Sequence, residues 1–259
     1  MDETNGLLSR NVVIMNFSGV YDMEGLPHNS RYKWLDCRHL SGTACYCDGD
    51  AMETLRQKLE EFDADGIHFI DSGNYHYLTK FWTDRITRPF SLVVFDHHPD
   101  MQPSLFDHIL SCGSWVKDVL DSNTNCRNVV IVGASDELIR AVPHGYEEKV
   151  HFYSDNDLNK EESWRKFSRE FVADPVYISI DKDVLSPEYA VTNWDQGTMD
   201  LKELEKLLYI ILRNHPVLGI DVCGEFLPDS DLTENLKDAT VDGRINKALL
   251  RLVSARCDE

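Results

Sequence analysis

Basic residues are scarce in this chain of 259 residues, in which 26 Lys and Arg stand against 45 Asp and Glu. The formal net charge of -19 repels nucleic acids and anionic membrane surfaces, and it favours cationic ligands. Long apolar runs are missing as well, since no stretch reaches the length needed to cross a bilayer. The opening segment MDETNGLLSR has neither the basic start nor the apolar run of a secretion signal. We therefore expect a cytoplasmic protein without nucleic-acid or membrane partners.

Cysteine is present but forms no disulfide framework, because the seven residues are scattered and odd in number. A chain of this size can bury enough apolar surface without disulfides, so we expect reduced thiols. Cys37, His39, Cys45 and Cys47 could hold zinc, but their spacing is not a common finger pattern. Loop packing or substrate binding is the favoured role of that stretch. Linkers and internal repeats are missing too, and we predict a single domain over residues 1–259.

Short apolar runs alternate with amphipathic segments, which is typical of a largely parallel sheet covered by helices. The runs lack polar alternation, as expected of strands buried on both faces, and they span residues 12–17, 67–70, 91–95, 129–132, 150–153, 176–180 and 217–220. Helices are expected after a capping box at Asp50 and Glu53, after a second box at Asp200 and Glu203, and over residues 241–256. We predict an α/β fold, a three-layer α/β/α domain with a largely parallel central sheet.

Two of the apolar runs end in clustered acidic and imidazole side chains. The first is followed by Asp96, His98 and Asp100 at alternate positions, and the second by Asp181 and Asp183. One Asp-rich strand end is commonly a loop or a helix cap. Two such ends are different, because ligands of open α/β sheets bind outside the carboxyl ends of the strands. His97 points the other way by alternation, and we interpret it as structural.

Four aspartates gathered at one point repel each other unless cations lie among them. Mixed Asp and His ligands suit manganese, iron or zinc, and the absence of cysteine from the motifs argues against a structural zinc site. The excess of carboxylates over imidazoles favours manganese, and we predict two Mn²⁺ ions. Because paired dications lower the pKa of bound water, hydrolysis is the predicted chemistry.

These motifs resemble the metal-binding signatures of the ureohydrolase family, the arginases, agmatinases and their relatives. The turn Ser72-Gly73-Asn74-Tyr75-His76 is similar to a third signature that ends in a histidine ligand, although Tyr75 stands where the family has Asp. The resemblance covers order and spacing from about residue 67 to residue 228. It implies that two residues, Asp96 and Asp181, bridge the metals, that His76 and Asp100 complete one ligand set, and that His98 and Asp183 complete the other.

The same resemblance implies attack on a guanidinium carbon to give urea and an amine, with a carboxylate holding the guanidinium by charge-assisted hydrogen bonds. Glu225 is our candidate for that carboxylate, and Asp221 is the alternative, because the spacing is one residue longer than in the family. We assign catalytic roles to Asp100, Asp183 and Glu225. We assign substrate contacts to Glu225, Ser114 and Asp136.

Departures from the family shape the predicted substrate. Residues 111–116 contain no histidine where arginases carry a proton shuttle, although His108 is nearby, and Leu138 stands where an acid would read a free amino group. The chain is also short for an arginase. The resemblance is therefore to members that convert arginine residues in peptides to ornithine, and the family's ring assemblies make a homo-oligomer an expectation. The alternatives are a hydrolase of free arginine or agmatine, a zinc deacetylase-like amidohydrolase, and a metal-binding protein without turnover.

Overall fold

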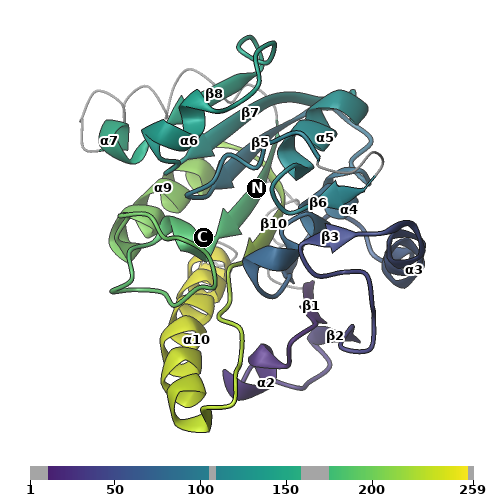
Figure 1. The fold of residues 1–259 in the computed structure, drawn as a ribbon, viewed down its shortest axis with the longest axis vertical. Helices are drawn as coiled ribbons and strands as arrows, with labels where there is room; N and C mark the ends of the chain where they lie inside the picture. Colours follow the sequence, from purple (N-terminus) through teal and green to yellow (C-terminus); the bar gives the residue numbers. More distant parts are fainter. Residues whose placement is uncertain (1–10, 105–108, 159–174, 256–259) are drawn as a thin grey trace.

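The computed structural model describes residues 11–104, 109–158 and 175–255 (Figure 1). Its main feature is one eight-stranded sheet in which every pair of neighbours is parallel. The strand order is β2-β1-β4-β10-β9-β5-β7-β8. In chain order these strands are β1 (Val12–Asn16), β2 (Tyr32–Asp36), β4 (Ile67–Phe69), β5 (Phe90–Phe95), β7 (Cys126–Val132), β8 (Val150–Tyr153), β9 (Val176–Asp181) and β10 (Val217–Cys223). The predicted α/β fold with a largely parallel sheet is confirmed.

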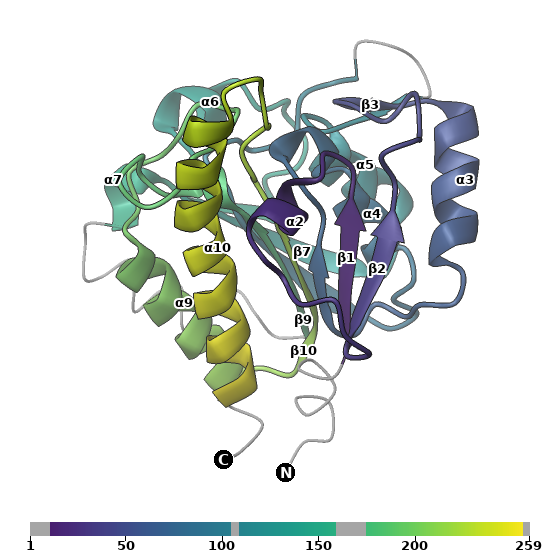
Figure 2. The same ribbon diagram turned by 90° about the horizontal axis from the view of Figure 1, so that it is seen from below.

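Helices cover both faces of the sheet, and Figure 2 shows α9 and α10 on one side and α3 on the other. One apolar core lies under α2 (Val20–Met23), α9 (Leu201–Asn214) and α10 (Leu232–Ala255). A second core lies under α3 (Gly49–Leu59), α4 (Leu78–Thr83) and α5 (Trp115–Ser122). Short elements complete the described chain: α6 (Asp136–Arg140), α7 (Asp155–Leu158), and the antiparallel pair β3 (Tyr46–Cys47) and β6 (Leu110–Ser111). Within these residues no helix combines the length and apolar character of a membrane span.

Each predicted apolar run contains a strand, and in most of them continuous β-branched and aromatic residues are buried on both faces. In β8 the two middle residues are half-buried. The edge strand β2 was not predicted, since it alternates between half-buried and exposed residues. The capping box of α9 is confirmed, with the Asp200 carboxylate accepting from the Glu203 amide at 2.8 Å. The box predicted at Asp50 is wrong. The cap of α3 is Asp48, which accepts from the Ala51 amide at 2.9 Å.

The last helix begins at Leu232 rather than at residue 241. The side chains of its first turns are mostly exposed, including those of Leu232 and Leu236. These turns therefore lack the regular apolar face from which the later turns were predicted.

The strand order determines what can meet at the carboxyl edge of the sheet. β9 lies between β5 and β10, and β10 lies between β9 and β4. The residues that follow these four neighbouring strands therefore converge at one edge, which is the expected position of a ligand site in an open parallel sheet.

Candidate metal centre

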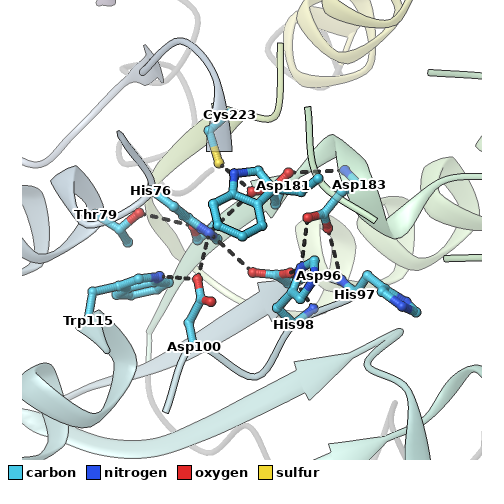
Figure 3. Close-up of polar contacts among 12 residues, drawn as sticks. His76, Thr79, Asp96, His97, His98, Asp100, Trp115, Asp181, Asp183 and Cys223 are labelled. Atoms are coloured by element: carbon cyan, nitrogen blue, oxygen red, sulfur yellow. Dashed lines mark hydrogen bonds and ion pairs between the residues drawn. The ribbon is translucent and has the colours of Figure 1, made fainter. Parts of the chain in front are cut away.

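Three segments that are distant in the sequence bring their polar side chains together at this edge (Figure 3). Asp96 directly follows β5, Asp181 is the last residue of β9, and His76 follows a 3-10 turn over Gly73–Tyr75 beyond β4. All three residues are at most 2% exposed. The three motifs therefore meet at one edge of the sheet, as predicted.

His76 presents one ring nitrogen to the carboxylates and anchors the other. Its Nδ1 lies 3.1 Å from Asp96 Oδ2, 3.0 Å from Asp100 Oδ2 and 3.4 Å from Asp181 Oδ2. Its Nε2 lies 2.8 Å from Ser179 Oγ. Because the Ser179 hydroxyl donates to the Asp221 carboxylate at 2.6 Å, it accepts from the Nε2–H. Nδ1 is therefore the atom available to a metal ion.

A second group forms around His98 on the other side of Asp96. His98 Nδ1 lies 2.9 Å from Asp183 Oδ2 and 3.5 Å from Asp96 Oδ1. The backbone amides of His98 and His97 donate to Asp96 Oδ1 at 2.6 Å and to Asp183 Oδ1 at 3.0 Å. The ring of His97 points away from the carboxylates (Figure 3), as the alternation argument predicted.

Asp100 is held by its backbone and by one indole. Its φ of 50° lies in the left-handed region, which turns the chain sharply after Pro99. Trp115 Nε1 donates to Asp100 Oδ2 at 2.7 Å, and the Val116 amide donates to the Asp100 carbonyl at 3.1 Å. The Trp115 ring also lies 4.8 Å from the His76 ring, centroid to centroid. The start of α5 therefore fixes one ligand directly and packs against another.

Crowding raises the pKa values of the central carboxyls. Burial, followed by the charges of Asp183 and Asp96, raises the pKa of Asp181 to about 7. Burial and the charge of Asp96 raise the pKa of Asp183 to about 6. For His98, burial lowers the pKa, but the hydrogen bonds that its ring donates to Asp183 and Asp96 outweigh burial and raise the pKa to about 12. Without a cation, Asp181 and His98 therefore hold protons near neutral pH, and a divalent ion would displace them.

The donor atoms fit divalent cations. Buried His76 Nδ1 and Asp96 Oδ2 have no hydrogen-bond partner in the described part of the chain, although both lie among potential ligands. Among the described residues, four groups of potential ligand atoms lie close enough to share an ion, and two of these groups have Asp96 in common. We call His76, Asp96, Asp100 and Asp181 the His76 site, and Asp96, His98 and Asp183 the His98 site. Oxygen and imidazole donors of this kind suit manganese, iron or zinc.

This centre also contains a sulfur atom that was not predicted from the sequence. Cys223, the last residue of β10, is fully buried and its Sγ lies 3.1 Å from Asp181 Oδ2. Strand register pairs Cys223 with Asp181, so both side chains leave the sheet edge together. Their alternation with Asp221 and Ser179 would have indicated this, because residues two apart on a strand share a face.

Glu225 does not occupy the position predicted for it. Its side chain is fully buried, accepts from Lys182 Nζ, and accepts from Asn246 Nδ2 at 2.9 Å. Gly224 has a φ of +86°, and this turn directs Glu225 toward α10 rather than toward the metal ligands. Its position does not support a substrate contact. The alternative, Asp221, accepts a hydrogen bond from the Ser179 hydroxyl, which in turn contacts His76 Nε2.

The other predicted substrate contacts are bonded to residues outside the metal centre. Ser114 is 1% exposed and bonded to Asp118 at 3.0 Å, and Asp136 accepts from Asn156 at 2.8 Å. His108 lies outside the described residues. No zinc group forms among Cys37, His39, Cys45 and Cys47, all four of which the structure describes.

The metal centre opens into a cavity of about 200 Å³. Asp96, His98, Asp100, Asp181 and Asp183 line its base. The remaining lining residues carry no charge and are Gly73, Pro99, Gln102, Cys112, Gly113, Leu138 and Trp194. Trp194 is 40% exposed and donates to Asn74 Oδ1 at 3.1 Å, which holds the indole across Gly73.

Comparison with known families decides the identity of this fold and site. The family model described as "Arginase family" matches residues 18–242. The chain belongs to the arginase family. As a member of this family, it is a hydrolase of amidine carbon–nitrogen bonds. An uncharacterized protein of Thermotoga maritima is 31% identical over 222 residues, covering 85% of this chain and 81% of that protein.

Solved structures of arginase-family enzymes share the fold. Proclavaminate amidino hydrolase from Streptomyces clavuligerus superposes with a TM-score of 0.67 at 17% identity, covering 94% of this chain and 92% of that one. Formiminoglutamase of Trypanosoma cruzi, solved with two Mn²⁺, gives 0.69 at 12% identity over 96% and 94%. Agmatine ureohydrolase of Thermoplasma volcanium gives 0.64 at 16% identity over 98% and 92%. These names refer to small molecules, so the predicted peptide substrate has no support from them.

Proposed function

We propose that the chain is a dimetal hydrolase of a small guanidino or amidino compound whose remaining part carries no charge. The observation that carries this proposal is the pair of ligand groups that share Asp96 and open into one cavity. The His76 site and the His98 site would each hold one ion, with Asp96 facing both. Manganese is the metal named in the trypanosomal relative, and the carboxylate-rich donor set suits it.

The residues divide the work between holding metals and shaping the substrate cavity. Two bound ions would activate water for attack on the amidine carbon. Asp100 and Asp183 complete the two ligand groups, and the anchored tautomer of His76 keeps Nδ1 toward the centre. Trp194 offers an aromatic face beside His98, with ring centroids 5.9 Å apart, and such a face attracts a planar guanidinium cation.

The uncharged upper wall of the cavity supports the proposed substrate class. Apart from the candidate metal ligands, no lining residue in the described part of the chain is acidic or basic. A charged ammonium or carboxylate tail would lose water there without gaining a partner. Leu138 supplies an apolar surface at this place. We therefore expect a neutral tail next to the amidine group.

The test is product release from a panel of amidines by metal-loaded protein. Guanidines should give urea and formimino compounds should give formamide, each with the matching amine. An alkylguanidine with a neutral tail should react faster than agmatine, free arginine or an arginine peptide. Asp96→Asn should abolish release, and Asp84→Asn, a surface carboxylate paired with Lys80, should leave it unchanged. Absence of product from every amidine would contradict the proposal.

A gain of specificity tests the neutral tail separately. Leu138→Asp introduces a carboxylate into the apolar wall, where it could pair with an ammonium group. We expect this variant to lower KM for agmatine by about tenfold or more, since a desolvated charge pair is worth more than an exposed one. An unchanged preference would show that the tail does not reach Leu138.

Two other function classes remain as outcomes of the same assay. A deacetylase-like amidohydrolase would bind one zinc per chain and release acetate from acylated amines, whereas the paired ligand groups here favour two ions. A metal-binding protein without turnover would take up two ions and release nothing. The count of bound metal and the product together separate these classes.

A further inference from the structure

Cys223 stands out among the cysteines because its surroundings are those of a metal ligand. The side chain is fully buried, and its Sγ lies 3.1 Å from the Asp181 carboxylate. The sulfur, an imidazole nitrogen of His76 and an Asp181 oxygen all lie within 4.8 Å of one another. By contrast, the buried thiol of Cys126 donates to the Asn128 carbonyl at 3.8 Å and belongs to none of the ligand groups among the described residues.

A second observation indicates that an ion belongs beside this sulfur. His76 Nδ1 is buried without a hydrogen-bond partner, and the side chain is 1% exposed. It is aimed at the same Asp181 oxygen that Cys223 contacts, at 3.4 Å. A nitrogen, a sulfur and a carboxylate oxygen converging in a buried space are typical of a transition-metal site.

We propose that Cys223 is a sulfur ligand of the metal held by His76 and Asp181. The metal–sulfur bond forms as the S–H bond breaks, and the proton leaves to solvent, so no oxidant or reductant is needed. This inference rests on the metal centre of the proposed function and assigns it one more ligand.

Sulfur changes which metals the two positions prefer. Thiolate is a soft ligand that favours zinc, cobalt or iron, whereas carboxylates and water favour manganese. The His76 site with Cys223 should therefore prefer the softer ions, while the His98 site, with oxygen and imidazole donors alone, should accept manganese. The two positions would then differ in metal identity within one centre.

X-ray absorption at the zinc edge of the zinc-loaded, unmodified protein tests the proposal. We expect a sulfur shell at about 2.3 Å beside the nitrogen and oxygen shell at about 2.0–2.2 Å. A shell of nitrogen and oxygen alone would overturn the proposal. Because the measurement uses the native chain, it does not depend on whether a variant folds.

Cobalt spectroscopy on variants gives the complementary test. The cobalt-loaded protein should show a thiolate-to-metal charge-transfer band in the near ultraviolet, which Cys223→Ser and Cys223→Ala should both remove. Cys112→Ser is the matched control, because Cys112 lines the cavity but belongs to none of the ligand groups among the described residues. A band that survives in both Cys223 variants would overturn the proposal.

These readouts are independent of catalysis. A sulfur shell in a protein that releases no product from any amidine would support the ligand and count against the proposed function. Urea release with no sulfur shell would support the function and overturn the ligand.

Discussion

Two clusters of buried carboxylates lie on different sides of the segment from Asp181 to Asp183, and they are neutralised in different ways. In the Lys182 cluster, the fully buried ammonium of Lys182 donates to Glu225 and lies 3.8 Å from Asp242. In the metal centre, buried carboxylates surround His76 and His98, and no lysine or arginine is paired with them among the described residues. One cluster contains its own permanent cation, and the other has the composition of a site that takes its cations from solution.

Hydrogen bonds from α10 also hold the carboxylates of the Lys182 cluster in position. Asn246 on α10 donates to Glu24 at 2.6 Å and to Glu225 at 2.9 Å. Burial and the charge of Glu225 raise the pKa of Glu24, and burial raises the pKa of Asp242 to about 7. The cluster ties the end of β9 to α10, directly behind two predicted metal ligands. We infer that this cluster positions the loop that carries Asp181 and Asp183.

The largest effect should follow from removing the internal cation. Lys182→Met leaves Glu225 and Asp242 buried without their positive partner, and breaking a buried pair in this way costs about 3–5 kcal/mol of unfolding free energy. Denaturant unfolding of the metal-free protein measures it. Lys80→Met, which removes a surface pair with Asp84, should cost less than about 1 kcal/mol.

The opposite change sharpens the contrast. Asp96→Asn removes one charge from the crowded metal centre, so the metal-free protein should keep its stability or gain some. A loss as large as that of Lys182→Met would show that the two clusters are neutralised alike, and the distinction between them would fail.

A smaller effect is expected where a neutral donor orients a ligand. Trp115→Phe removes the 2.7 Å hydrogen bond to Asp100 while keeping an aromatic ring against His76. Loss of such an outer contact typically lowers metal affinity about 10–100-fold, which calorimetric titration can measure. Trp82→Phe is the control, because the buried Trp82 Nε1 has no hydrogen-bond partner. Equal losses in both variants would mean that the effect comes from packing.

The sequence predicted the framework, and the meeting of the candidate ligands at one edge, for one reason. Strands buried on both faces read as unbroken apolar runs, and the ligand motifs follow directly where two such runs end. The strand β2 escaped prediction because it lies at the exposed edge. The sequence did not predict which residue after β10 faces the metal centre. The left-handed turn at Gly224 directs Glu225 away from the ligands, so Cys223 is the last residue of this strand whose side chain contacts one of them.

Ser114, the residue at the start of α5, also shows that sequence spacing does not specify which way a side chain points. A serine in a loop near ligand motifs is compatible with substrate contact, but here its hydroxyl bonds Ser111 and Asp118 inside the protein. Which of two neighbouring polar residues faces a cavity depends on backbone turns of single residues, and sequence spacing does not specify them.

The smallest effect is expected at His68. This buried histidine has no charged partner among the described residues, whereas the histidines of the metal centre, His76 and His98, lie beside carboxylates. His68 stacks on Trp82 at 3.7 Å, and burial lowers its pKa to about 3. In the unfolded chain the imidazole titrates near pH 6.5, so between these pH values the unfolded state binds more protons than the folded state. Stability must therefore rise with pH across this window and fall as the solution is acidified. His68→Gln should reduce the slope of unfolding free energy against pH by up to about 1.4 kcal/mol per pH unit, measured by denaturant unfolding of metal-free protein. His144→Gln, at a side chain fully exposed to solvent, should leave the slope unchanged, and an equal slope in wild type and His68→Gln would mean that His68 is already charged in the fold.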